Sequence, residues 1–179
     1  MDIDQYYKPL MEDLRQGKRV FFKAPKPVMK EISEYFAETV QNANKVEMRK
    51  VLCLVDHCQL PQTFFTDIIC QALEKEDDPE LIVFLLSSST THIIRRIKEG
   101  EIRAPESYLQ SLQKLLTHSN PEVVEWNLRI IEQMPKLPNA LKLIVLKNKP
   151  SVLKILDKHQ KASRQIITML EKRWHHVRK

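Results

Sequence analysis

The chain contains the stretch Asn120-Pro121-Glu122-Val123-Val124-Glu125-Trp126-Asn127-Leu128-Arg129-Ile130-Ile131, which carries a helix start followed by apolar residues at helical spacing. Asn120 is a residue type that caps helices, Pro121 suits the first helical position, and Glu122 lies where the helix dipole favours an acid. The stretch therefore predicts an amphipathic helix that begins at Pro121.

Related openings recur along the chain, and their recurrence predicts how the helices pack. They are Val46-Glu47-Met48-Arg49, Pro79-Glu80-Leu81-Ile82 and Pro150-Ser151-Val152-Leu153. Each opening is followed by aliphatic residues at helical spacing. Because one helix pair cannot bury its apolar face alone, a recurring pair predicts neighbours that stack and share one elongated core.

The amino-acid composition favours an all-α fold. The chain has two glycines, whereas a β-rich protein needs many more for its turns. It has ten prolines, and several stand where a helix can begin without losing a hydrogen bond. These prolines are Pro27, Pro61, Pro79, Pro105, Pro121, Pro138 and Pro150. We therefore expect many short helices.

The openings resemble the second helix of HEAT and armadillo-type repeats, which often begins with Asp or Asn, a turn, proline, an acid, valine and arginine. Asn120-Pro121-Glu122-Val123 and Asp78-Pro79-Glu80-Leu81 match that order, and Met48-Arg49 supplies the aliphatic–arginine step. Ile82, Val124 and Leu153 stand where arginine is usual. The resemblance covers residues 27–159 and implies an α-solenoid-like stack of antiparallel helix pairs. An irregular helical bundle is the alternative.

We expect one all-helical domain over residues 1–179, because no long linker or low-complexity segment divides the chain. Residues 1–26 are expected to form a helix and a linker, residues 27–159 the helical repeats, and residues 160–179 a basic capping helix. Terminal repeats need a polar outer face, which suits such a cap.

Two details of this prediction concern individual helices. The hydroxyl-rich run 87–91 predicts a break in the chain, followed by a short basic helix over 91–98. Pro150 predicts a helix over 150–159, with Val152, Leu153, Ile155 and Leu156 as its apolar residues.

The charge is unevenly distributed. Residues 142–179 hold eleven Lys/Arg and two acids, a net charge of +9, which leaves −3 for residues 1–141. Such a basic end marks a surface for nucleic acid, phospholipid or an acidic protein, or else a solvated helical cap. The candidate partner-binding residues are Lys147, Lys149, Lys154, Lys158, Lys161, Arg164, Lys172, Arg173 and Arg178.

Candidate catalytic and metal-ligating residues are few. Cys53, His57 and Cys58 lie within six residues, but zinc needs four ligands and no fourth is evident. Cys53 adjoins an apolar stripe, which favours a cysteine that packs as a small hydrophobe. Without a glycine cluster, no phosphate-cradling loop can form. We therefore expect no catalytic residue, no bound metal and no cofactor.

The function expected from these patterns is binding. A helical-repeat scaffold or adaptor that holds another protein through its solenoid surface is the first interpretation. A nucleic-acid-binding protein that uses the basic C-terminal third is the alternative. The chain also remotely resembles HEAT-like DNA glycosylases, which pair a basic face with tryptophans and a catalytic acid. Trp126 and Trp174 carry this resemblance. No residue stands out as the acid.

The location expected is the cytoplasm. The chain has no apolar run of about 18 residues, so we expect no transmembrane segment. Its N-terminus lacks the basic-then-apolar pattern of a secretion signal, and its three cysteines are an odd number that suits reduced thiols. The oligomeric state is left open by the sequence.

Overall fold

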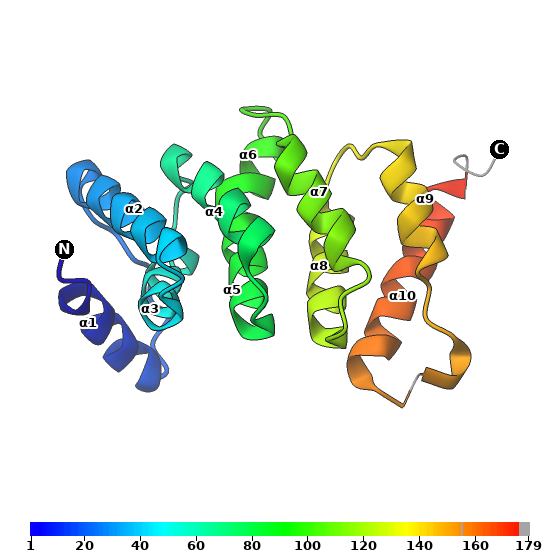
Figure 1. The fold of residues 1–179 in the computed structure, drawn as a ribbon, viewed down its shortest axis with the longest axis horizontal. Helices are drawn as coiled ribbons and strands as arrows, with labels where there is room; N and C mark the ends of the chain where they lie inside the picture. Colours follow the sequence, from blue (N-terminus) through cyan, green and yellow to red (C-terminus); the bar gives the residue numbers. More distant parts are fainter. Residues whose placement is uncertain (155, 176–179) are drawn as a thin grey trace. The chain divides into compact units, whose positions relative to one another are not determined.

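The computed structural model describes residues 1–154 and 156–175 and consists of helices joined by short loops (Figure 1). The helices are α1 (Asp4–Arg15), α2 (Lys26–Gln41), α3 (Lys45–Asp56), α4 (Thr63–Lys75), α5 (Pro79–Ser89), the π-helix η1 (Thr90–Ile94), α6 (Arg95–Lys98), α7 (Glu106–Leu115), α8 (Pro121–Gln133), α9 (Asn139–Lys147), the 3-10 helix η2 (Val152–Lys154) and α10 (Lys158–Arg173). The described residues contain no strand, only an isolated bridge between Phe22 and Cys58. The predicted all-α class is confirmed.

The chain divides into two compact units, Met1–Arg96 and Ile97–Lys179. The first unit is built from the consecutive pairs α2–α3 and α4–α5, with α2 packed on α4 and α3 packed on α5 (Figure 1). Helix α1 covers α3. The core between these helices holds fully buried Phe36, Leu52, Phe65 and Leu85.

Three of the four predicted motif openings start helices. Helix α8 begins at Pro121, where the Asn120 side chain accepts a hydrogen bond from the Glu122 N–H at 2.8 Å. Asp78 caps α5 in the same way, and Asn44 caps α3. Because a cap side chain satisfies backbone donors that the helix itself leaves unpaired, these starts follow from local sequence.

The predicted break at 87–91 is wrong. Helix α5 leads through η1 into α6 without an interruption. Ser89 Oγ donates to the Leu86 carbonyl oxygen at 2.7 Å inside the helix, whereas Ser88 Oγ is buried without a hydrogen-bond partner among the described residues. Burial of His92, Ile93 and Ile94 fixes the π-helical segment.

In the second unit, α7 packs on α8, and α10 packs on α8 and α9. Asn127 is fully buried and donates from Nδ2 to the Leu112 carbonyl oxygen at 2.8 Å, which joins α8 to α7. Trp174 follows the last turn of α10 and is buried, as the periodicity of that helix predicts. Residue 155 and residues 176–179, including the predicted end of the last helix, lie outside the described residues.

The helix predicted over 150–159 is also wrong. In this range the structure has the short η2, followed by Asp157 with an extended backbone. The Asp157 side chain caps α10 by accepting a hydrogen bond from the Gln160 N–H at 2.8 Å. Asp157 cannot both cap α10 and continue a helix that began at Pro150. The fourth opening of the motif therefore forms no α-helix, and its apolar residues are left exposed.

Candidate functional site

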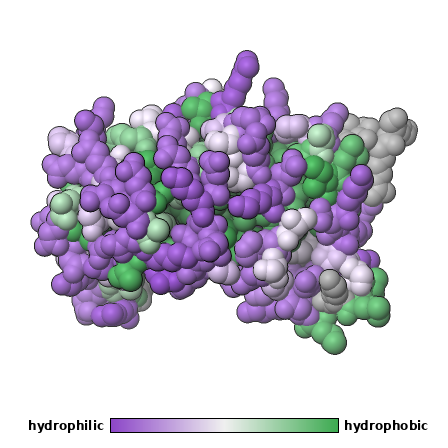
Figure 2. Space-filling model, in the orientation of Figure 1, coloured by the Kyte–Doolittle hydropathy of each residue, from purple (hydrophilic) through white to green (hydrophobic). Residues whose placement is uncertain are grey.

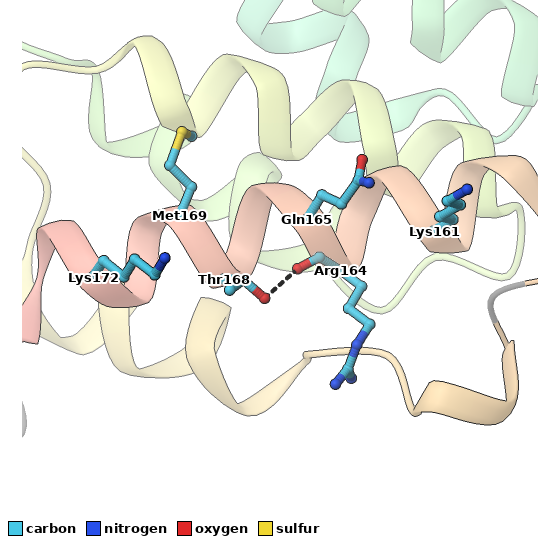
Figure 3. Close-up of a pocket in the computed structure, with 6 residues that line it drawn as sticks. All are labelled: Lys161, Arg164, Gln165, Thr168, Met169 and Lys172. Atoms are coloured by element: carbon cyan, nitrogen blue, oxygen red, sulfur yellow. Dashed lines mark hydrogen bonds between the residues drawn. The ribbon is translucent and has the colours of Figure 1, made fainter.

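Helix α10 separates its residues into a buried face and an exposed face. Ser163, Ile166, Ile167 and Leu170 are buried, and α10 packs against α8. The opposite side of the helix carries a shallow hollow, shown in Figure 3. It is lined by Lys161, Arg164, Gln165, Thr168, Met169 and Lys172. Spacings of three and four place these residues on one helical face, so α10 brings three of the predicted cations together.

Several other predicted cations already have partners within the second unit. Lys149 Nζ lies 2.8 Å from Glu171 Oε2. Arg164 donates from Nη1 to the Pro150 carbonyl oxygen at 2.6 Å, and Arg173 donates from Nη1 to the Glu132 carbonyl oxygen at 3.0 Å. These contacts attach the segment before η2 and the end of α8 to α10. The three charged side chains therefore also stabilise the packing of the second unit.

The remaining predicted cations are distributed over the same unit. Lys147 ends α9, and Lys158 begins α10; both are exposed. The Lys154 side chain and the whole of Arg178 lie outside the described residues. The structure therefore places Lys161, Arg164 and Lys172 on one face, and Lys147 and Lys158 at the ends of two helices.

The segment between α9 and α10 exposes apolar side chains beside these cations. Leu153 is 90% exposed, Leu156 is 100% exposed, and Val152 is also exposed. Figure 2 shows hydrophobic surface at the lower right, where Figure 1 draws this segment. Sequence reasoning missed this feature because periodicity assigned the same residues to a buried helix face. We call Val152, Leu153 and Leu156 together with the exposed face of α10 the α10 surface.

A buried ionic cluster holds the first turn of α10 against α8. Glu125 on α8 is 8% exposed, and its Oε2 accepts a hydrogen bond from His159 Nδ1 at 2.7 Å. Its Oε1 accepts one from Arg129 Nε at 2.9 Å. The sequence did not predict this contact, because the two residues that meet are 34 positions apart.

The cysteines of the first unit, Cys53, Cys58 and Cys70, are buried core residues. Burial, and to a smaller extent the Asp56 carboxylate, raises the pKa of Cys53 to about 11 and that of Cys58 to about 12. Because the thiolate is the nucleophile and the metal ligand, these thiols are held in their unreactive form.

His57 does not complete a ligand set with them, since its Nδ1 lies 2.8 Å from the Cys53 carbonyl oxygen. Across residues 1–154 and 156–175, no group of three or more His, Cys, Asp or Glu side chains is placed to hold a metal ion. In the same part of the chain, no helix has the length and apolarity that crossing a membrane requires.

Comparison with known proteins gives no match, since no protein family, no curated protein and no solved structure matches this chain. The resemblance to HEAT and armadillo repeats therefore rests on the motif residues themselves.

Proposed function

We propose that this chain is a non-catalytic helical scaffold that binds another protein through the α10 surface. Exposure of Leu153 and Leu156 carries the proposal. Burying a leucine side chain stabilises a complex by about 1.5–3 kcal/mol, and exposed apolar groups rimmed by polar residues mark interaction sites.

The chemistry of this surface also defines the partner. Lys158 and Lys161 place positive charge in the first turn of α10, directly after the apolar segment, and the Asp157 carboxylate caps α10. A protein segment that carries both apolar and acidic side chains complements both features. Nucleic acid complements only the charge, because its phosphates are contacted by charged and polar groups and not by leucine side chains.

The proposal includes a HEAT-like arrangement of the helix pairs in the first unit and a cytoplasmic location. In support of the first, Arg49 of one motif opening contacts Asp78 and Glu80 of the next, at 3.2 and 2.8 Å, which links neighbouring pairs. In support of the second, the three cysteines are all free.

The binding surface is tested by crosslinking this chain and matched variants to their binding partners and comparing the proteins recovered. The test variant carries Leu153→Ser and Leu156→Ser, and the control carries Val46→Ser, which removes an exposed apolar side chain from the first unit. We expect the same protein to be recovered with the unsubstituted chain and with the control. The amount recovered with the test variant should be at least about tenfold lower. Equal recovery with all three chains would overturn the proposal.

A second candidate function, nucleic-acid binding, is favoured by the shared face of Lys161, Arg164 and Lys172 (Figure 3). Titration of a DNA or RNA probe across a salt series tests it, because affinity that rests on phosphate contacts falls steeply with salt. If nucleic acid is the partner, Lys161→Glu with Lys172→Glu abolishes binding, and Leu153→Ser with Leu156→Ser does not. Absence of binding at physiological salt would exclude this candidate.

A further inference from the structure

A second hollow lies within the second unit, apart from the α10 surface. It forms where the turn after α7, the first turn of α8, the end of α9 and the early turns of α10 meet. Its volume is about 380 Å³, many times the roughly 30 Å³ that one water molecule occupies in the liquid. The space therefore admits a polyatomic ligand.

The hollow has a positive lining. Lys147 and Lys149 line it from the end of α9 and the residues after it, and none of the described lining residues is Asp or Glu. Glu171 reaches Lys149 from α10 and offsets part of its charge. Lys147 is exposed, and the first turn of α8 adds the positive end of a helix dipole. A ligand here is therefore anionic.

His118 supplies a neutral donor. Its Nδ1 accepts a hydrogen bond from the Asn120 N–H at 3.1 Å. A ring nitrogen that accepts carries no proton, so in the neutral ring the proton lies on Nε2, which can donate. The side chain lines the hollow. His118 is thus held in the tautomer that suits an anion.

Ser163 provides the observation that points independently to a ligand. The residue lines the hollow and is 1% exposed, and its Oγ has no hydrogen-bond partner among the described residues. A buried hydroxyl without a partner is unfavourable and calls for an explanation such as a ligand.

We propose that this hollow binds a phosphate group, either as the free anion or on a phosphorylated side chain. Three lining residues offer donors: Ser163 through its hydroxyl, His118 through its ring N–H and Lys147 through its ammonium group, whereas the Lys149 ammonium is paired with Glu171. A tetrahedral oxyanion presents enough acceptors for all of them, and hydrogen bonds to an ionised acceptor are the strong kind. The site does not depend on the protein-binding surface proposed above.

NMR titration of the full chain with inorganic phosphate tests the site, with backbone amide shifts as the readout. We expect saturable shifts at residues 116–118 and around Ser163. Lys147→Ala and Ser163→Ala each weaken binding at least about tenfold, because each removes one of a few donors to the anion. Lys136→Ala removes the same charge from an exposed position that does not line the hollow, and it leaves the affinity unchanged.

A phosphoserine peptide and its unphosphorylated counterpart distinguish the source of the phosphate. Tighter binding of the phosphopeptide than of inorganic phosphate assigns the group to a protein partner, and weaker binding assigns it to the free anion. Ser163→Ala removes a hydroxyl that has no hydrogen-bond partner among the described residues, so the melting temperature of this variant should not be lower than that of the unsubstituted chain. Absence of saturable shifts with inorganic phosphate, or equal effects of Lys147→Ala and Lys136→Ala, would overturn the proposal.

Discussion

Arg49 on α3 contacts Asp78, the residue that caps α5, with Nη2 and Oδ2 3.2 Å apart. The two oxygens of this carboxylate have separate tasks, since Oδ1 accepts hydrogen bonds from the Glu80 and Leu81 N–H groups at 3.0 and 3.3 Å. Asp78 therefore starts one helix and links it to the helix pair before it. The motif opening at Asp78 determines both a local structure and a contact between neighbouring pairs.

Replacing Asp78 should destabilise the first unit more than replacing Glu80, which also contacts Arg49. Loss of an N-cap residue costs about 0.5–2 kcal/mol, and an exposed ion pair contributes less than about 1 kcal/mol. We expect Asp78→Ala to lower the free energy of unfolding by about 1–2 kcal/mol, and Glu80→Ala to change it little. Urea denaturation followed by circular dichroism measures both. Equal losses would show that the cap is not the main role of Asp78.

His92 makes the stability of the first unit depend on pH. Burial lowers the pKa of His92 to about 4, and the positive charge of Arg96 acts in the same direction, whereas the hydrogen bond to the Val55 carbonyl oxygen opposes it. The unfolded chain binds this proton near its ordinary pKa of about 6.5. The folded protein therefore binds fewer protons, and its stability is full above pH 6.5 and declines as the pH falls towards 4.

The full effect amounts to about 3 kcal/mol, from the difference between the two pKa values. His92→Gln keeps a polar side chain but cannot titrate. We expect the free energy of unfolding of the unsubstituted chain to decline between pH 6.5 and pH 4 more steeply than that of the variant. Parallel curves over this interval would show that His92 does not contribute. Carboxylates titrate in both chains and cancel in the comparison.

Local signals account for what the sequence predicted well, and packing accounts for what it missed. The helix starts at Lys45, Pro79 and Pro121 follow from caps that act within one turn. The prediction over 150–159 failed because apolar periodicity cannot tell a buried face from an exposed one. Asp157 decides this region, and its role as the cap of α10 requires knowing where α10 begins.

The candidate sites divide in the same way. The shared face of Lys161, Arg164 and Lys172 follows from helical spacing alone, so the sequence was enough to propose a basic surface. The hollow around Ser163 brings together residues from four elements, and no local pattern reveals that its hydroxyl lacks a partner. Sequence reasoning finds a face on one helix more readily than a site built between helices.

Two aliphatic residues of the second unit should differ sharply in their contribution to stability. Leu156 is fully exposed, whereas Ile167 is buried, and α10 packs against α8. Leu156→Ala should leave the free energy of unfolding within about 0.5 kcal/mol of its original value. Ile167→Ala should lower it by about 2–5 kcal/mol, because it leaves a cavity. A large loss for Leu156→Ala in urea denaturation would mean that the 148–157 segment packs against the fold.

Glu125 should control how firmly α10 is attached to α8. Its carboxylate accepts hydrogen bonds from both His159 and Arg129, so Glu125→Gln removes the charge that these two partners share. Hydrogen bonds to a charged group contribute about 1.5–3 kcal/mol each. Arg129 is half exposed and can turn to water, which reduces the loss, and we expect a total of about 1–3 kcal/mol.

Hydrogen exchange locates this loss. Amides in the first turns of α10 should exchange faster in Glu125→Gln, since His159 is the contact that holds this end of the helix. Glu122→Gln is the matched control, because Glu122 lies on the same helix and is exposed. Faster exchange in both variants would point to α8 as a whole. Faster exchange in Glu125→Gln alone means that the start of α10, which borders the Ser163 hollow, opens when the Glu125–His159 contact is lost.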